Sequence, residues 1–292
     1  MKPPPFTYHA PRDLGEALET LAGVGGKVLA GGQSLIPMLN MRLAAPEHLV
    51  DINRVAALAT LEAAPEGVTV GALARHAQVA RADAHPLLGQ ALRLVAHPVI
   101  RNRGTVVGSL VHADPAAELP AVLAVLGGSV RLARHGQGER DVPAEEFFVG
   151  PMESAVRPGE LAVSAFFPVL PAGSGTAFRE VARRHGDYAL AGVCAAVTLD
   201  EDLHVASARV ACIGVGPVPV VADVTTECDR RPASTVDWAA VTRAVQEATE
   251  PEGDIHASAA YRLHLVGVLA EQALKDAARA AAQEAAPSPA TG

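Results

Sequence analysis

The stretch Ala30-Gly31-Gly32-Gln33-Ser34-Leu35-Ile36-Pro37 follows the short apolar run Val28-Leu29. An apolar run, a double glycine and then a serine are typical of a strand that ends in a tight turn and continues as a helix. In that arrangement consecutive backbone N–H groups point into one concavity, where they can hold a phosphate or a pyrophosphate. We expect Ser34 to cap the helix, which would extend to about residue 43.

A double glycine alone is equally consistent with a plain tight turn, and no common nucleotide motif accompanies it. The chain contains no G-x-G-x-x-G sequence and no glycine followed by lysine and a hydroxyl residue, so it lacks the Rossmann and P-loop fingerprints. Ile36 stands where a nucleophile elbow around Ser34 would need glycine. These comparisons favour Ser34 as a cap and phosphate ligand rather than a nucleophile.

A second glycine-bearing segment, Arg101-Asn102-Arg103-Gly104-Thr105-Val106-Val107-Gly108-Ser109, lies further along the chain. We expect a turn and then a strand over 106–111, because the residues there are apolar and β-branched. The hydroxyls of Thr105 and Ser109 are candidate ligand contacts, and Gly108 would let the backbone approach closely.

Two carboxylates follow this segment. Asp114 and Glu118 are four residues apart, so they share one face if a helix has begun, and they could accept hydrogen bonds from sugar or ribityl hydroxyls. Capping of a helix by the same two residues is the alternative interpretation. His112 and Asp114 have no third ligand at a suitable spacing, so we expect no metal site.

The remaining pattern predicts two domains with different architectures. Residues 1–55 indicate a small α/β unit with parallel-type strands at 27–30 and 48–52. A Pro/Gly/Ser cluster at 168–175 is the best candidate for a domain boundary. Beyond it, strands predicted at 176–183, 190–199 and 204–213 precede helices at 236–249 and 257–282. That order is typical of an α+β domain with helices on one face of an antiparallel sheet, and we expect a disordered tail over 284–292.

Composition narrows the possible partners and the location. The 292 residues are 49% hydrophobic and carry a net charge of −8, so nucleic acid and anionic membrane surfaces are poor candidates. The N-terminal sequence has no apolar segment typical of a signal peptide, and no run is long enough for a transmembrane helix. The spacing of Cys194, Cys212 and Cys228 indicates neither a disulfide framework nor a metal cage. We therefore expect reduced thiols in a cytoplasmic protein.

The whole chain resembles the medium, FAD-binding subunit of the xanthine dehydrogenase and carbon monoxide dehydrogenase family of molybdenum hydroxylases. The resemblance covers about residues 1–280. It rests on the residues at 30–37, on Ile100-Arg101-Asn102-Arg103-Gly104-Thr105 with His112-Ala113-Asp114-Pro115, and on Arg183-Arg184-His185-Gly186-Asp187-Tyr188-Ala189. It implies a vanillyl-alcohol-oxidase-type FAD-binding domain over 1–173, with subdomains of about 1–55 and 56–173, and a flavoprotein C-terminal domain over 174–283.

For the cofactor, FAD, the resemblance implies contacts from both domains and no catalytic residue in this chain. Residues 29–35 would cradle the pyrophosphate, and residues 105–109 would contact phosphate and flavin. Asp114 or Glu118 would bind sugar or ribityl hydroxyls, and Tyr188 would cover one face of the isoalloxazine. The full set of candidate contacts is Leu29, Ala30, Gly31, Gly32, Gln33, Ser34, Leu35, Thr105, Val106, Gly108, Ser109, Asp114, Glu118, Leu161, Arg179 and Tyr188.

The resemblance also implies an oxidoreductase subunit within a larger complex. Electrons would pass from iron–sulfur clusters on a small partner subunit through FAD to NAD, oxygen or a quinone. A large molybdopterin-binding subunit would carry out substrate hydroxylation. A dimer of such heterotrimers is expected, with no nucleic acid and no stable membrane insertion.

One position departs from the pattern of the family. Relatives usually carry Thr-x-Gly-Gly in the second segment, whereas here Val107 stands in place of the first glycine. If that position needs a positive φ, a β-branched residue costs about 1–3 kcal/mol there. An FAD-free subunit retained for assembly is therefore the alternative hypothesis.

Overall fold

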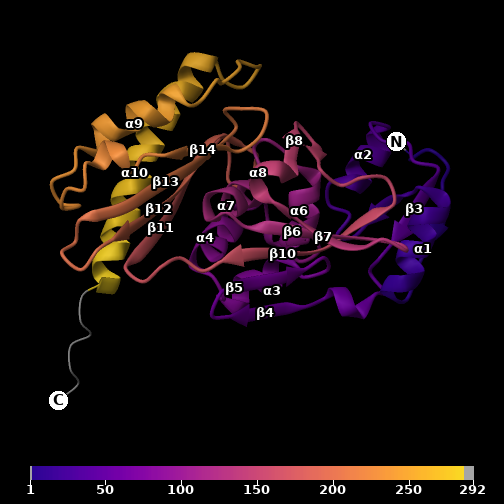
Figure 1. Ribbon diagram of the computed structural model, residues 1–292. Coiled ribbons are helices and arrows are strands. Elements are labelled where there is room, and N and C mark those ends of the chain that lie inside the picture. The colour runs from indigo at the N-terminus through magenta and orange to yellow at the C-terminus, as the bar shows by residue number, and fades with distance from the viewer. Residues whose placement is uncertain (1, 286–292) are drawn as a thin grey trace. The chain divides into compact units, whose positions relative to one another are not determined.

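The computed structural model describes residues 2–285, and within them the chain forms two compact units (Figure 1). The first unit contains residues 2–85, 96–114 and 127–168. The second contains residues 86–95, 115–126 and 169–285. The second unit therefore includes two short segments from the N-terminal half, in addition to everything after residue 168. The expected domain boundary near 173 stays a prediction.

The first unit begins with a small parallel sheet, in the strand order β1-β3-β2. Its strands are β1 (Thr7–His9), β2 (Lys27–Leu29) and β3 (His48–Asp51), and its helices are α1 (Leu14–Val24) and α2 (Leu35–Met41). The Asp13 side chain accepts from the Glu16 N–H and caps α1, and Gly25 ends the helix in the left-handed conformation. This segment is the α/β unit that the sequence predicts.

A five-stranded antiparallel sheet forms the rest of the first unit, in the order β4-β5-β10-β6-β7. Its strands are β4 (Leu61–Ala64), β5 (Gly67–Gly71), β6 (Ser129–Arg134), β7 (Gly138–Pro143) and β10 (Glu160–Pro168). A small hairpin, short helices and a 3₁₀ turn accompany the sheet: β8 (Phe148–Gly150), β9 (Glu153–Ser154), η1 (Ala56–Leu58), α3 (His76–Ala82), α5 (Pro98–Arg101), α6 (Val106–His112) and α8 (Ala144–Phe147).

The strand predicted at 106–111 is wrong, because those residues form helix α6. Thr105 has extended backbone angles, and its hydroxyl accepts from the Gly108 N–H, which is a helix N-cap. Val106 and Val107 are buried. A short apolar run does not by itself distinguish a strand from a helix. Here the Thr105 cap favours the helix.

The second unit has the predicted antiparallel sheet with helices packed on it, and the sheet contains a fourth strand that the sequence does not predict. The strands run in the order β11 (Ser174–Ala182), β12 (Ala189–Leu199), β13 (Val205–Ile213) and β14 (Val220–Asp223). Helices α9 (Trp238–Glu247) and α10 (Ala259–Ala285) follow, with the 3₁₀ turn η2 (Thr226–Cys228) before them. Helices α4 (Pro86–Leu94) and α7 (Glu118–Leu126) also contact this sheet, which agrees with the burial of β12 along nearly its whole length.

Two expectations concern the C-terminus and membranes. The tail expected to be disordered lies outside the described residues from 286 onward, and residues 284 and 285 end α10. Across residues 2–285, none of the helices combines the length and apolar character needed to cross a bilayer.

The packing of α10 on the sheet depends on a close approach at Gly175. A Cβ atom at this position would overlap the carbonyl oxygen of Ala277 and the amide nitrogen of Ala281, both on α10. Ala277 and Ala281 are fully buried, so the helix has no room to shift along this face.

We predict that Gly175→Val lowers the free energy of unfolding of the second unit by about 3 kcal/mol, because it forces α10 off β11. The measurement is urea unfolding followed by the fluorescence of Trp238, the single tryptophan of the chain, which is 5% exposed in this unit. Gly23→Ala is the control, because a Cβ there meets nothing within 4 Å. An unchanged unfolding midpoint for Gly175→Val would contradict the packing.

Candidate cofactor-binding site

The first glycine turn connects strand β2 to helix α2 and leaves a row of backbone donors unused. Gly32 has φ +75°, a left-handed conformation that glycine adopts without strain. The first helical hydrogen bonds are donated by Ile36 to Gly32 and by Met38 to Ser34. Within the described residues, the N–H groups of residues 31–34 donate to no protein group. These donors are therefore available to a ligand, and their convergence on a phosphate stays a prediction.

Ser34 stands at the N-cap position of α2, but its side chain makes no capping hydrogen bond. Its backbone is already helical, with φ −98° and ψ −47°, whereas a capping serine usually has extended angles. The prediction that Ser34 caps the helix is wrong. Since the hydroxyl is not used on the helix end, it remains a candidate ligand group beside the free N–H groups.

The two glycine segments are in direct contact. A Cβ atom at Gly31 would lie 2.5 Å from the carbonyl oxygen of Arg103 and 2.9 Å from the Cα of Gly104. No side chain fits into that space, so Gly31 is required for the approach. This contact joins the end of β2 to the turn before α6.

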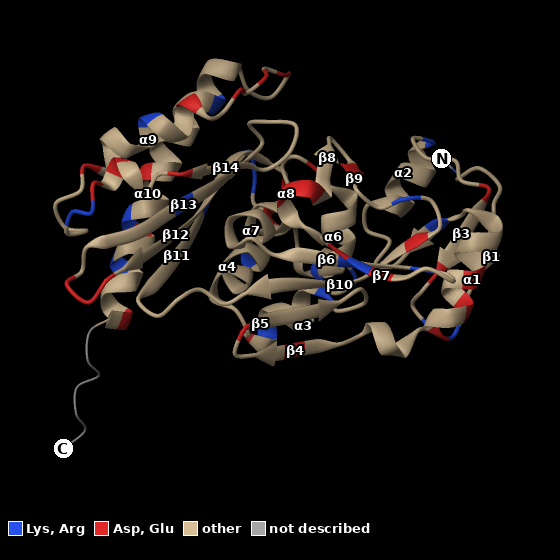
Figure 2. Cartoon of the chain, viewed as in Figure 1, with Lys and Arg blue, Asp and Glu red and all other residues tan. Residues whose placement is uncertain are grey.

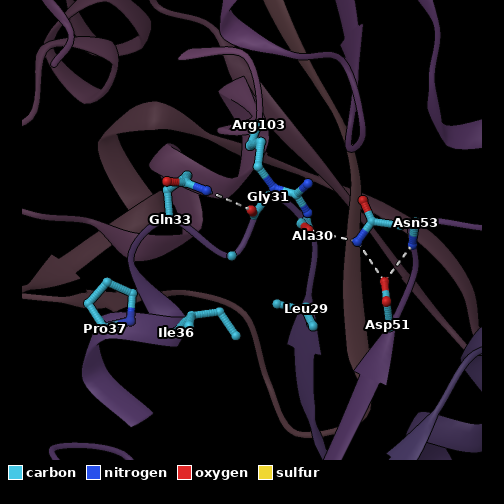
Figure 3. A pocket seen from close by; sticks show the side chains of 10 residues that line it. Leu29, Ala30, Gly31, Gln33, Ile36, Pro37, Asp51, Asn53 and Arg103 are labelled. Carbon is cyan, nitrogen blue, oxygen red and sulfur yellow. Dashed lines mark hydrogen bonds between the residues drawn. The ribbon is translucent and has the colours of Figure 1, made fainter. Parts of the chain in front are cut away.

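A cavity of about 380 Å³ opens beside this contact (Figure 3). Backbone of the first turn forms one side, and Arg103 contributes a guanidinium from the second segment. Its lining residues are Leu29, Ala30, Gly31, Gly32, Gln33, Ile36, Pro37, Asp51, Asn53 and Arg103. Free N–H groups and a guanidinium are the groups that binding of an anion requires.

This region also contains three polar residues that belong to no motif predicted from the sequence: Asp51, Asn53 and Arg75. Asp51 Oδ1 accepts from the backbone N–H of Asn53 at 2.9 Å and from its Nδ2 at 2.6 Å. The available signal was the sequence Asp-Ile-Asn at the end of a parallel strand beside the glycine turn, because ligands bind at the carboxyl ends of such strands.

The second segment uses its own hydroxyls inside the protein. The Thr105 hydroxyl is buried and occupied by the cap of α6. Ser109 Oγ lies 3.0 Å from Nε2 of His76, which is buried beneath the turn. Burial lowers the pKa of His76 to about 4, so this imidazole is neutral at pH 7. Contacts of Thr105 and Ser109 with a cofactor stay predictions.

Known protein families match both parts of the chain. A family model described as the FAD binding domain in molybdopterin dehydrogenase matches residues 4–170, and one described as the CO dehydrogenase flavoprotein C-terminal domain matches residues 176–277. The chain belongs to this family of FAD-binding subunits. It is an oxidoreductase component, the FAD-binding medium subunit of a molybdenum hydroxylase-like complex.

Its relatives match it over nearly their whole length. The 6-hydroxypseudooxynicotine dehydrogenase complex subunit alpha of Paenarthrobacter nicotinovorans is 42% identical, over 95% of this chain and 96% of that protein. The carbon monoxide dehydrogenase medium chain of Hydrogenophaga pseudoflava is 34% identical, over 95% and 98%. The crystal structure of quinoline 2-oxidoreductase from Pseudomonas putida 86 matches with a TM-score of 0.88 and 34% identity, over 96% of this chain and 99% of that chain.

The residues of the FAD-binding subunit fit its cofactor at the first turn. Unused N–H donors, a Gly31 that excludes any Cβ and an arginine on the cavity wall match what a diphosphate requires. Val107 does not disturb this arrangement, because it lies inside α6 without a positive φ and its side chain is only 2% exposed. The backbone strain that motivated the FAD-free alternative is therefore absent.

The other candidate contacts of the flavin subunit are distributed over both units. Leu161 is buried on β10 of the first unit. Asp114 precedes α7 and Glu118 is the first residue of that helix, so the condition for a shared helix face is not met. Arg179 on β11 forms an ion pair with Asp276 of α10. Tyr188, before β12, is 63% exposed.

We predict that His76 makes the first unit of this subunit acid-sensitive. Its folded-state pKa of about 4 lies below the ordinary value of 6.5, so between pH 4 and pH 6.5 the unfolded chain binds a proton more readily than the folded chain. Stability is lost as pH falls from 6.5 toward 4, by about 2 kcal/mol at pH 5. The test compares urea unfolding at pH 7 and at pH 5. Unfolding of the first unit is measured as the loss of circular dichroism that occurs while the fluorescence of Trp238, in the second unit, is still native.

His76→Gln should remove this loss, because the amide can still bond Ser109 and does not titrate. His135→Gln, at an exposed position in the β6–β7 loop, should behave like the wild type. Equal pH dependence in His76→Gln and the wild type would rule out His76 as the source.

Proposed function

We propose that the first glycine turn binds the diphosphate of FAD, with residues 29–35 as the cradle. The observation that carries this proposal is the set of N–H donors at residues 31–34 that no protein group uses. The positive φ of Gly32 keeps these donors facing the cavity. Ser34 adds a hydroxyl, and Arg103 adds a positive charge to the lining of the cavity.

The other contacts belong to the same proposal. The segment with Thr105, Val106, Gly108 and Ser109 forms the wall against which phosphate and flavin lie. Asp114 or Glu118 accepts from sugar or ribityl hydroxyls, as carboxylates do. Leu161, Arg179 and Tyr188 contact the flavin, with Tyr188 over one face of the ring. The exposure of Tyr188 supports its part in this assignment, since an aromatic side chain held at the surface can still stack.

Bound FAD supplies redox chemistry, and this chain supplies binding and orientation. We propose that electrons arrive from iron–sulfur clusters of a small partner subunit and leave to NAD, oxygen or a quinone. We further propose that a large molybdopterin-binding subunit completes a heterotrimer, which forms a dimer. Family membership supports this arrangement.

The cysteines of this chain support an outside source of electrons. Burial raises the pKa of Cys228 to about 11 and that of Cys212 to about 12, and it also raises the pKa of Cys194. Thiols held in the protonated form are poor ligands for iron. Their burial in the reduced form also supports a cytoplasmic location.

We predict that Gly32→Val abolishes FAD retention, because valine is strained at φ +75° and its side chain would meet Ile36 and Leu29. Trp238 fluorescence should remain native, since the second unit does not contain this turn. The measurement is flavin absorbance per purified chain. Gly136→Val is the matched control, with a positive φ of 68° in the β6–β7 loop and open space around it.

Two results would count against the proposal. Undiminished flavin in Gly32→Val would remove the diphosphate from this turn. A colourless wild-type protein that fails to take up added FAD would overturn FAD binding by this chain and restore the assembly-only alternative.

A further inference from the structure

A chain of side-chain hydrogen bonds connects the two glycine turns behind the cavity. Asn53 Nδ2 donates to the carbonyl oxygen of Ala30 at 2.8 Å. Asn53 Oδ1 accepts from Arg75 Nη2 at 2.6 Å. Arg75 Nη1 donates to the carbonyl oxygen of Arg103 at 2.5 Å. Two side chains therefore fix the backbone of the first turn to that of the second.

The amide end of this chain is held in one orientation. Asp51 Oδ1 accepts from both the backbone N–H and the Nδ2 of Asn53, as Figure 3 shows. The amide nitrogen must then be the donor to Ala30, which leaves the amide oxygen for Arg75. Asp51 is fixed in turn by the hydroxyl of Tyr8, which donates to its Oδ2 at 2.5 Å.

The arginine end of the chain needs a planar fork. A guanidinium reaches an amide oxygen and a backbone carbonyl at once through two separate nitrogens, whereas the ammonium group of lysine is a point donor. Arg75 is partly buried, which lowers its pKa, and the nearby charge of Arg103 lowers it further. The positive charges of Arg75 and Arg103 repel each other, so a diphosphate bound beside Arg103 would relieve that repulsion.

We propose that Arg75 and Asn53 are positioning residues for the diphosphate of FAD, and that Arg103 is the cation which this diphosphate neutralises. The proposal rests on the assignment of the diphosphate to the first glycine turn. Arg75 and Asn53 do not need to touch the cofactor. They hold the free N–H row and the Arg103 turn in a fixed position relative to each other.

The test measures the dissociation constants of the full-length chain, freed of flavin, for FAD and for ADP. FAD binding is followed by the change in flavin fluorescence, and ADP by its competition with FAD. The variants are Arg75→Met, Arg75→Lys, Asn53→Ala and the double variant Arg75→Met with Asn53→Ala. Trp238 fluorescence and circular dichroism verify folding of each protein.

The matched control is Arg131→Met. Arg131 is an exposed cation of the first unit, bonded through Nε to Asp141 at 2.8 Å on the β6–β7 hairpin. Figure 2 shows basic and acidic residues along this hairpin. Arg131 does not line the cavity, so its loss removes the same charge without disturbing the turns.

We expect Arg75→Met and Arg75→Lys each to weaken FAD and ADP binding at least tenfold, and Arg131→Met to stay within twofold of the wild type. The double variant should bind FAD and ADP with the same affinity as whichever single variant binds them less tightly. Either change alone already breaks the same chain of hydrogen bonds. Arg75→Lys keeps its charge, and it tests the proposal even if Arg75→Met fails to fold.

Three results would overturn the proposal. Wild-type affinity in Arg75→Lys would mean that charge alone matters, and additive losses in the double variant would mean that the two residues act separately. Wild-type affinity in all variants would remove both residues from the binding machinery. A wild-type chain that binds FAD but is indifferent to ADP would instead overturn the diphosphate assignment itself.

Discussion

The close approach of Gly31 to the backbone of Arg103 and Gly104 is the constraint on which the site depends. Backbone meets backbone here, with the Arg103 carbonyl 2.5 Å from where a Cβ of residue 31 would lie. The parallel sheet thereby ends against the turn that begins α6. Because both segments line one cavity, a shift of either one changes the shape of the whole binding surface.

The two turns contribute different things to this surface. The hydroxyl groups of the second turn are paired within the protein, because Thr105 caps α6 and Ser109 pairs with a neutral His76. The first turn does not, since its N–H groups have no protein acceptor within the described residues. Unpaired backbone donors are costly when water is excluded, so a bound anion stabilises the first turn more than the second. In the proposed site, the first turn therefore supplies the free backbone donors, and the second turn supplies the Arg103 side chain from a backbone whose polar groups are already paired.

The sequence predicted the strands and turns that depend on local residue patterns. It did not predict the hydrogen bonds between side chains that are distant along the chain. The strand before Gly31 and the three long strands after 173 follow from apolar runs and turn residues. The residues of α6 were predicted to form a strand because several of them are β-branched. They form a helix, which the side chain of Thr105 caps. The Asn53–Arg75 pair joins residues 22 positions apart with no repeating pattern, so only the fold could reveal it.

Val107 shows why a departure from a family pattern needs a backbone before it can be interpreted. Glycine is required where φ is positive or where a Cβ would collide, and Gly31 and Gly32 meet these conditions. Position 107 has a helical backbone, and its side chain is enclosed by protein. Gly108, one residue on, is the constrained position, because a Cβ there would lie 2.5 Å from the Thr105 hydroxyl that caps the helix. The chain therefore keeps glycine where the geometry demands it and replaces it where a helix accepts valine.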